Sequence, residues 1–533
     1  MNKPVLLLAA VFVVGIGAAA YLLLHRDSGV TSSPLGAPSP TQDTAFKNEL
    51  DKIRSAEKIE DPVQRCLAYP DPYEFHWDHE QVEQLCKRLT WRMLSWNEIR
   101  QLLDDHHPEK LDVAFDSYLN QNFDDPQRHG FLTWTFWWTF QNPSAEETAL
   151  TQRWVDADPS SAYALAARGI HYSQAAYAAR GGNSFGKTSG DQLSRMQEFV
   201  DESRTDLEKS LTINPRLIAA YHGLLRISRL SESKTPREDW VHRALALDAA
   251  DPWIYEDWID DTEPQWGGST IEMEHIADEA ATHAKENPLL ATLKAEPLCN
   301  QGDDFRCTEC TKDGAKALDF YKQAGGFGPS GCFLDGAGAA AVSAQDSQSA
   351  VRYYSQAVRF IGGGDWYAYR AQALRSIGEN EWAMRDLDKA IAANPRNTTA
   401  LYSQGLIFTS MQRFGDAEST YGKILTLDPN HQNATIALSM LYLSESTPLY
   451  APEKARPLVV HLVTINPSLA QAWLLKAAVS WIDHDAPAYI EAGENYLKFV
   501  DHDDPANQND IPAIQKRIEQ ARQYQKAQNQ SPH

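Results

Sequence analysis

Basic residues are scarce in this chain. The sequence holds 49 lysine and arginine residues against 72 aspartate and glutamate residues, which gives a net charge of -23. Binding to nucleic acid requires a basic face, so this balance argues against a nucleic-acid partner. An acidic surface is also repelled by anionic lipid, so any attachment to a membrane has to be hydrophobic.

Signals of β-structure and of metal chemistry are also sparse. From Ala45 onward apolar residues recur at helical spacing, and strand-like alternation is nearly absent. The local clusters His76–Glu80 and Asp104–His107 lack a helical ligand spacing such as H-E-x-x-H, and they are typical of a solvated surface. We therefore predict an all-α protein that is not an enzyme and has no cofactor.

One long hydrophobic stretch is present, near the start of the chain. Pro4–Leu24 is 21 residues without a charge, and as a helix it would span about 31 Å, the thickness of a hydrocarbon core. Ala18-Ala19-Ala20 offers a small-residue cleavage site, so a cleaved signal peptide is the alternative. The apolar run continues through Tyr21–Leu24, past that site, which favours an uncleaved anchor over residues 1–25.

The charges that flank this stretch set its orientation only weakly. Lys3 precedes it, and His25 and Arg26 follow it. We expect a single-pass anchor in the inner (cytoplasmic) membrane, with its amino terminus inside and the body on the periplasmic side.

Cysteines are few but even in number. An even count in an exported chain is compatible with disulfides, and Cys66 and Cys86 can pair with each other. Cys307-x-x-Cys310 is half of a zinc site, but Cys299 and Cys332 flank it singly instead of forming a second pair. For these four cysteines two disulfides are favoured, and zinc or free thiols remain open.

Asn-Pro and Asp-Pro pairs divide the chain at regular intervals. Successive prolines lie 37 and 36 residues apart from Pro215 to Pro288, and 34 and 38 apart from Pro395 to Pro467. Proline disfavours helical geometry in the residue before it and fits the first turn of a helix, and Asn or Asp can cap. The spacing predicts helical hairpins. The pairs are Asp158-Pro159, Asn214-Pro215, Asp251-Pro252, Asn287-Pro288, Asn394-Pro395, Asp428-Pro429 and Asn466-Pro467.

The repeat is clearest over residues 364–431. With Pro395 and Pro429 aligned at the ends of 34-residue units, small and aromatic residues fall at equivalent positions: Ala371, Leu374, Gly378, Ala383, Leu387 and Ala390, then Gly405, Phe408, Ala417, Tyr421 and Ile424. This pattern resembles the tetratricopeptide (TPR) family. The resemblance implies pairs of antiparallel helices that stack into a right-handed superhelix. Gln404 departs from the pattern, because the family usually has leucine there.

The segment from about 100 to 300 is less regular and carries three distinctive strings. These are the aromatic run Trp134–Phe140, the turn Ala167-Arg168-Gly169, and Pro264-Gln265-Trp266-Gly267-Gly268-Ser269. Together they resemble a bacterial domain family of unknown function with a P-x-W-G-G-S motif, which precedes or merges with TPR-like repeats. The resemblance implies helical repeats and carries over no site residue.

These observations predict a helical solenoid behind a membrane helix. The expected parts are a transmembrane anchor (1–25), a flexible linker (26–44), a helical-repeat domain (45–300), a cysteine-containing insertion (301–340), TPR-like repeats (341–506) and a capping helix with a tail (507–533).

Three local motifs have both a structural and a functional interpretation. Residues 181–188 match the phosphate-binding pattern G-x-x-x-x-G-K-[ST], but an alanine-rich helix is expected before them where a P-loop needs a strand, which favours a polar loop. Trp134–Phe140 can stack on sugars or fill a core, and core is favoured. Ser269 with Glu272, and Ser144 with Glu147, fit capping boxes; the alternative for Trp266–Ser269 is an anion nest.

The most direct functional prediction is binding of another protein. In a TPR array the first helix of each pair lines a groove for a peptide or a partner helix. We therefore expect contacts from Trp366, Tyr369, Arg370 and Tyr402, to a partner with a basic patch. The function would be a scaffold or assembly factor at the bacterial envelope. The alternatives are a glycan-binding envelope protein and a nucleotide switch that uses residues 181–188.

Overall fold

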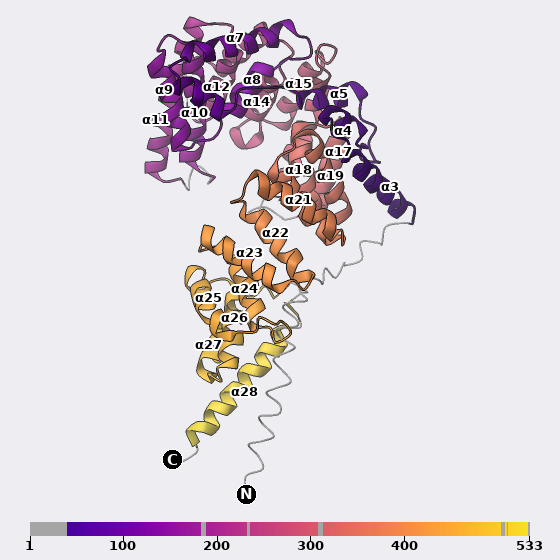
Figure 1. The fold of residues 1–533 in the computed structure, drawn as a ribbon, viewed down its shortest axis with the longest axis vertical. Coiled ribbons are helices and arrows are strands. Elements are labelled where there is room, and N and C mark those ends of the chain that lie inside the picture. The colour runs from indigo at the N-terminus through magenta and orange to yellow at the C-terminus, as the bar shows by residue number, and fades with distance from the viewer. Residues whose placement is uncertain are drawn as a thin grey trace. The chain divides into compact units, whose positions relative to one another are not determined.

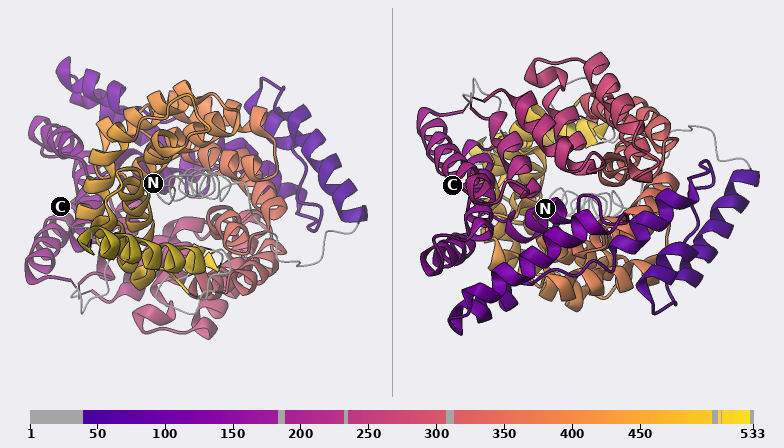
Figure 2. Two further views of the ribbon diagram at one scale, coloured as in Figure 1. Left: turned by 90° about the horizontal axis from the view of Figure 1, so that it is seen from below. Right: turned by 90° about the horizontal axis from the view of Figure 1, so that it is seen from above.

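The chain is helical wherever its structure is described. The computed structural model describes residues 40–182, 188–231, 235–306, 313–502, 507–508 and 510–530, and these contain no β-strand. The chain divides into two compact units (Figures 1 and 2). The N-terminal unit is Thr41–Ile361, and the C-terminal unit is Gly362–His533 together with Met1–Pro40.

The helices of the N-terminal unit follow one another with short connections. They are α3 (Pro40–Ala56), α4 (Pro62–Ala68), α5 (His79–Arg88), α6 (Trp96–Asp104), α7 (Pro108–Asp124), α8 (Phe131–Phe140), α9 (Ala145–Ala157), α10 (Ala162–Arg180), α11 (Gly190–Ile213), α12 (Ile218–Ser228), α13 (Arg237–Leu247), α14 (Pro252–Asp261), η2 (Pro264–Trp266), α15 (Thr270–Ala281), η3 (Pro288–Ala295), α16 (Glu296–Arg306), α17 (Gly314–Gly325), α18 (Gly331–Ser343) and α19 (Ser347–Phe360).

The C-terminal unit is a run of helix pairs closed by one longer helix. Its helices are α20 (Gly364–Ser376), α21 (Asn380–Ala393), α22 (Thr398–Ser410), α23 (Phe414–Leu427), α24 (Gln432–Leu443), α25 (Pro452–Ile465), α26 (Ala470–Ile482), α27 (Ala486–Phe499) and α28 (Asp510–Gln530). The terminal helix α28 packs Ile514 and Ile518 against Tyr489 and Tyr496 of α27.

None of the described helices combines the length and the apolar character that crossing a bilayer requires. The predicted anchor Pro4–Leu24 lies outside the described residues, as do most residues of the predicted linker.

The Asn-Pro and Asp-Pro pairs mark helix boundaries, as predicted. At Asn394 and Asp428 the preceding helix ends, and the side-chain oxygen accepts a hydrogen bond from the backbone N–H two residues on, at 3.0 Å in both cases. The prediction that proline opens the next helix is correct for Pro252 and Pro288. It is wrong for Pro395 and its counterparts, because the Asx turn occupies three more residues before the next helix begins.

Serine caps two helices where the sequence predicts them. Ser144 accepts from the backbone N–H of Glu147 at the start of α9, and Ser269 accepts from Glu272 at the start of α15. Before Ser269, Gly267 has a φ of 96°, and a Cβ on Gly268 would lie 2.2 Å from the carbonyl oxygen of Thr262. The P-x-W-G-G-S string is therefore a tight turn and a cap.

The TPR-like residues fill the core of the C-terminal unit. Ala371, Leu374, Ala383, Leu387 and Ala390 are fully buried. In the next pair Ala417, Tyr421 and Ile424 are likewise buried, and the Tyr421 ring packs on Gly405. The two helices of a pair are joined through a left-handed residue, which is Gly378 in one pair and Gln412 in the next, 34 positions on.

Two glycines of one helix pair are expected to respond to alanine with opposite signs. A Cβ on Gly405 would lie 2.4 Å from the Tyr421 ring, whereas one on Gly422, inside α23, would meet nothing within 4 Å. Gly405→Ala should lower the free energy of unfolding of the C-terminal unit by about 1–3 kcal/mol through overpacking. Gly422→Ala should raise it by about 0.5–1 kcal/mol through helix propensity. Urea titration of both variants measures the difference, and equal effects would contradict this packing.

The core of the N-terminal unit is aromatic around α8. Phe136 and Phe140 are fully buried against Phe115 and Trp154. The prediction that the Trp134–Phe140 run is core is thus correct for these rings, whereas Trp138 is 45% exposed. Two disulfides also belong to this unit: Cys66–Cys86 joins α4 to α5, and Cys299–Cys332 joins α16 to α18.

Candidate functional site

The predicted binding residues lie on α20 and α22, the first helices of two successive pairs in the C-terminal unit. Trp366 and Tyr369 lie one turn apart on α20, with ring centroids 5.9 Å from each other, and Tyr369 is 40% exposed. Tyr402 on α22 is half-buried, and its ring lies 6.1 Å from Tyr421 and 6.0 Å from His431. Three aromatic side chains on two successive first helices therefore reach the surface.

Arg370 does not belong to this surface, and its prediction as a partner contact is wrong. The side chain is fully buried and lies against Asp386 of α21, with Nε–Oδ2 and Nη2–Oδ1 distances of 2.7 and 2.8 Å. Its guanidinium also stacks over Trp382, 5.2 Å from the ring centroid. This bidentate pair fixes α20 to α21.

Gln404 lines a pocket on the other side of the same helices. The pocket has a volume of about 390 Å³ and includes Asp388 of α21, Leu401 of α22 and Lys423 of α23. Leucine is the residue that the TPR pattern has at Gln404. Here Gln404 instead places a polar side chain in the pocket wall.

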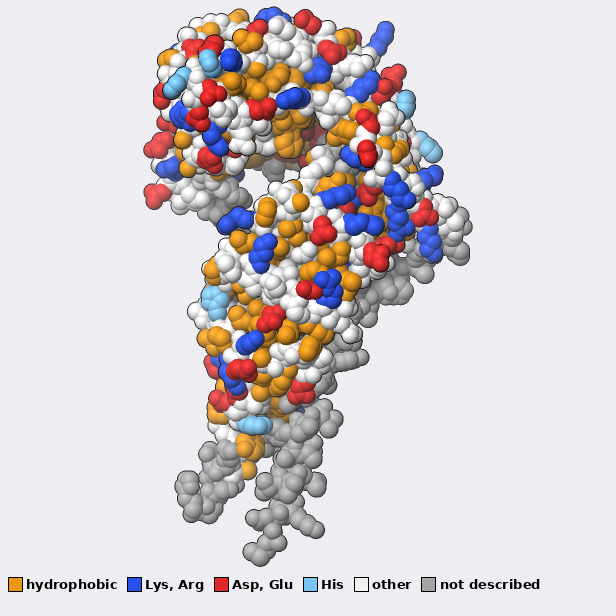
Figure 3. Space-filling model, in the orientation of Figure 1, with side chains coloured by type: hydrophobic (Ala, Val, Ile, Leu, Met, Phe, Trp, Pro, Cys, Tyr) orange, Lys and Arg blue, Asp and Glu red, His pale blue; other side chains and the backbone are white. Residues whose placement is uncertain are grey.

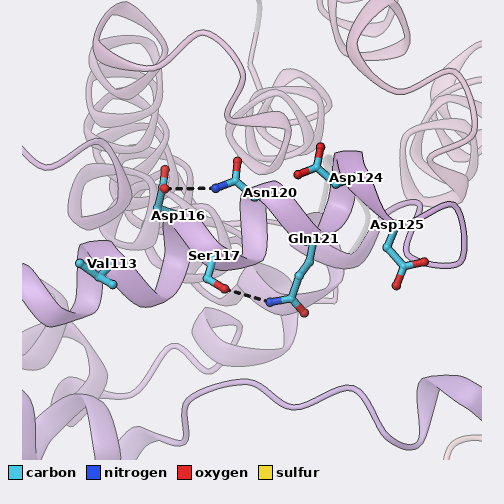
Figure 4. Close-up of a pocket in the computed structure, with 7 residues that line it drawn as sticks. All are labelled: Val113, Asp116, Ser117, Asn120, Gln121, Asp124 and Asp125. Carbon is cyan, nitrogen blue, oxygen red and sulfur yellow. Dashed lines mark hydrogen bonds between the residues drawn. The ribbon is translucent and has the colours of Figure 1, made fainter.

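A polar pocket of about 410 Å³ lies along α7 in the N-terminal unit (Figure 4). Two of its contacts run within the helix: Asn120 donates to Asp116 at 3.2 Å, and Gln121 donates to Ser117 at 3.1 Å. The side chains labelled in Figure 4 form no nucleophile–base pair. The pocket is a solvated acidic surface. Its lining residues are Val113, Asp116, Ser117, Asn120, Gln121, Asp124 and Asp125.

A buried charge network connects α12 to α14, and the sequence analysis missed it. Asp257 is 3% exposed and lies 2.8 Å from the imidazole of His222, 3.1 Å from Arg226 and 2.8 Å from Arg229. Arg229 also pairs with Asp261. The only sequence signal is the acid-rich end of α14, where carboxylates recur three to four residues apart.

The network keeps its central carboxylate ionised. Burial alone would raise the pKa of Asp257, but His222, Arg226 and Arg229 outweigh burial and hold the pKa well below its usual range. Burial lowers the pKa of Arg229, and Asp257 and Asp261 more than compensate, so that pKa lies above its ordinary value. These ion pairs hold α12 against α14.

Other carboxyl groups of the N-terminal unit hold protons near neutral pH, which predicts a pH dependence. Burial raises the pKa of Glu147 and of Asp260 to about 7. Because the unfolded carboxyl groups ionise near about pH 4, the folded unit binds more protons between these values, and its stability falls as pH rises. Each such proton changes the free energy of unfolding by about 1.4 kcal/mol per pH unit.

We therefore expect the N-terminal unit to be less stable at about pH 8 than at about pH 6, as urea titrations followed by tryptophan fluorescence would measure. Glu147→Gln should reduce the slope. A stability that rises over this interval would contradict the assignment.

The structure describes four of the six cysteines and only the two ends of the glycine-rich loop 181–188. Cys299 and Cys332 are brought together, which removes both from a zinc site, while Cys307 and Cys310 lie outside the described residues. Of the 181–188 loop, residues 183–187 lie outside them as well. The helices α10 and α11 precede and follow this loop, where a P-loop needs a strand before it. Residues 182–186 also match the nucleophile pattern G-x-S-x-G, which likewise needs a strand before it.

Sequence comparison places two segments in known families. Residues 95–232, which run from α6 to α12, match a domain of unknown function, DUF4034. The P-x-W-G-G-S string at 264–269 lies beyond that match. Residues 398–431, which contain α22 and α23, match the tetratricopeptide repeat.

Over residues 398–431 the chain is similar to a tetratricopeptide repeat. The match covers one full unit, including Tyr402, Gly405 and Tyr421, and it confirms the resemblance seen in the sequence. Tetratricopeptide repeats are scaffold elements, built to stack and to present the surface of their first helices.

Solved tetratricopeptide-repeat structures are similar to parts of the chain at low identity. A tetratricopeptide repeat protein from Parabacteroides merdae is 14% identical, with a TM-score of 0.36; the alignment covers 50% of this chain and 98% of that one. Yeast Tom70 is 10% identical, with a TM-score of 0.35 and coverage of 81% and 95%. YrrB, described as having an unusual peptide-binding site, is 21% identical, with a TM-score of 0.28 and coverage of 37% and 96%. No curated protein matches the sequence.

Proposed function

We propose that this chain is a protein-interaction scaffold, in which the first helices of the C-terminal unit bind an extended peptide or a helix of a partner without catalysing a reaction. One observation carries the proposal. The repeat residues of α20–α23 fill their own core, while Trp366, Tyr369 and Tyr402 remain at the surface of successive first helices. Aromatic anchors of this kind supply much of the energy in protein interfaces.

Charge supports a basic partner. The chain carries a net charge of -23. On the face drawn in Figure 3, acidic and basic side chains are interspersed. Complementary charge raises the rate of association more than it raises affinity.

We further propose that the body lies in the bacterial periplasm, held by residues 4–24 as a membrane anchor. The length and composition of that stretch support an anchor. The two disulfides of the N-terminal unit support an oxidising compartment, because disulfides persist there and are rare in the cytosol.

Partner capture tests the binding proposal. Proteins cross-linked to the full chain in cells should be lost when Tyr369 and Tyr402 are replaced by alanine. Arg385→Ala is the matched control, because this exposed residue lies on the second helix α21. Capture that survives the double substitution, or that is lost equally in the control, would contradict the proposed surface.

Thiol labelling in cells tests the location. A membrane-impermeant maleimide, applied before and after reduction, should reach Cys66, Cys86, Cys299 and Cys332 only after reduction. A C-terminal reporter that is active only outside the cytoplasm should also be active. Free thiols together with a silent reporter would place the body in the cytosol.

A further inference from the structure

The acid-rich helix α14 contributes carboxylates to a second cluster, which adjoins the Asp257 network through the contact of Asp260 with Arg229. Glu256 lies against the start of α18, since a Cβ on Gly331 would be 3.3 Å from its Oε1. Asp260 lies one turn further along α14, and its side chain is 33% exposed. The positive end of the helix dipole at the start of α18 stabilises a nearby carboxylate. This explains one acidic side chain at that position, but it does not explain several.

Glu296, the first residue of α16, faces the same region and is the least accessible member. It is 7% exposed, and its carboxylate accepts a hydrogen bond from the backbone N–H of Cys332. Its other carboxylate oxygen, Oε1, has no hydrogen-bond partner. The negative charges that act on it most strongly are those of Glu256, Asp260 and Glu263. A buried acceptor without a donor is costly, so this oxygen points to an absent cationic or donor group.

Among the described residues, the cations that act on Glu256 and Asp260 are Arg88, Arg226 and Arg229. Arg88 at the end of α5 stacks between Trp91 and Trp253, 5.3 and 5.4 Å from their ring centroids, and its Nε and Nη2 make no hydrogen bond. Burial lowers the pKa of Arg88 to about 10, and Glu256 and Asp251 act against that shift. Arg229 is held by Asp257 and Asp261. Its Nη1 also lies 3.5 Å from Oδ2 of Asp260, so within the cluster it pairs with that carboxylate.

We propose that this α14–α18 carboxylate cluster, made of Glu256, Asp260, Glu263, Glu296 and Asp335, receives a lysine or arginine side chain of the partner protein. The inference rests on the proposed scaffold function and names a second contact, on the N-terminal unit. Asp335 is the exposed member of the cluster, where a cation from solvent would first meet it. The negative charge of the cluster favours a cation, and the unpartnered Glu296 oxygen requires a hydrogen-bond donor. An elongated side chain with a positive charge and several N–H donors meets both requirements.

Bound protons provide a signature of this docking. Burial, reinforced by the neighbouring carboxylates, raises the pKa of Glu256 and of Glu296. An entering ammonium or guanidinium group would stabilise the ionised forms, so binding near pH 7 releases protons into the buffer. The charged groups that act on the two glutamates from the surrounding residues are Arg88, Asp257, Asp260, Glu263 and Asp335, and Glu296 also accepts from the backbone N–H of Cys332.

A pentalysine peptide titrated into the full chain in detergent tests the proposal. We expect saturable binding that weakens about tenfold in Glu256→Gln and in Glu296→Gln, because each removes a carboxyl group that ionises when the cation binds. Glu198→Gln, an exposed acid on α11, removes the same charge elsewhere and should leave the affinity unchanged. Equal weakening in all three variants would mean diffuse attraction to an acidic protein and would overturn the proposal, as would the absence of binding.

Further readouts separate docking from its alternatives. Glu296→Gln keeps an oxygen for the Cys332 N–H and relieves like-charge repulsion, so its melting temperature should be unchanged or higher while binding falls. Calorimetry in two buffers of different ionisation enthalpy should show proton release for the wild type and less for the variants. Spermidine or Mg²⁺ that binds more tightly than the peptide would contradict a side-chain ligand.

The Tyr369→Ala/Tyr402→Ala double variant separates this inference from the proposed function. It should bind pentalysine normally while losing partner capture. If partner capture requires Tyr369 and Tyr402 but the wild-type chain does not bind pentalysine, the proposal for the carboxylate cluster is wrong and the proposed function stands. If the double variant binds pentalysine normally and still captures the partner, the carboxylate-cluster proposal stands and the proposed aromatic surface is wrong.

Discussion

Arg370→Ala is expected to destabilise the C-terminal unit by about 3–5 kcal/mol, because it leaves a charged carboxylate buried without its partner. Asp386 is the residue left behind, and its side chain is 1% exposed. A loss of this size is a large share of the total stability of a typical domain, which is about 5–15 kcal/mol. Urea titration, followed by hydrogen exchange of peptides from α20 and α21, measures it.

Two controls separate charge from packing in that experiment. Arg413→Ala breaks an exposed pair with Asp416 in the same unit, which should cost at most about 1 kcal/mol. Replacing Arg370 and Asp386 together by leucine removes both charges and should recover most of the loss. A single Arg370 variant as mild as the Arg413 control would show that the pair is not buried.

Asp257→Ala should be equally costly in the N-terminal unit, at about 3–5 kcal/mol. The substitution leaves His222, Arg226 and Arg229 without their common carboxylate, and the side chains of His222 and Arg229 are 7% and 8% exposed. Asp201→Ala, which breaks an exposed pair with Arg204, should change stability by at most about 1 kcal/mol.

Urea titration of both aspartate variants, followed by tryptophan fluorescence, gives the comparison. Asp257→Asn is a useful intermediate, because the amide keeps the shape and loses the charge. If Asp257→Ala and Asp201→Ala cost the same, the network between α12 and α14 does not contribute as described.

The helical repeats could be predicted because their signals are local. A proline restricts the residue before it, and an Asn or Asp side chain accepts from a backbone N–H two residues on. Asn394-Pro395 and Asp428-Pro429 therefore predict turns from the residues of the turn alone. The contact between Gly405 and Tyr421 could also be predicted, because the family pattern sets the spacing between the small and the large residue. The number of residues between a turn and the next helix was not predicted, because it depends on how the Asx turn closes.

The candidate site was predicted less completely, because its residues are distinguished by distant partners. On sequence alone Arg370 looks like Tyr369, a polar or aromatic residue on a first helix, and only the position of Asp386 shows that it is interior. The Asp257 network depends on contacts between residues 28 to 35 positions apart. Glu296 and Glu256, 40 positions apart, come together only when α16 and α18 pack beside α14.

Site-specific photo-cross-linking in cells tests the central claim most directly. A photoreactive phenylalanine analogue would replace Tyr369 or Tyr402 on the first helices, or Arg385 or Thr426, which are exposed on the second helices. We predict a discrete adduct with one partner protein from positions 369 and 402 and none from positions 385 and 426. Adducts only from the second helices, or from no position in cells that hold the full-length chain, would contradict a scaffold that binds through its first helices.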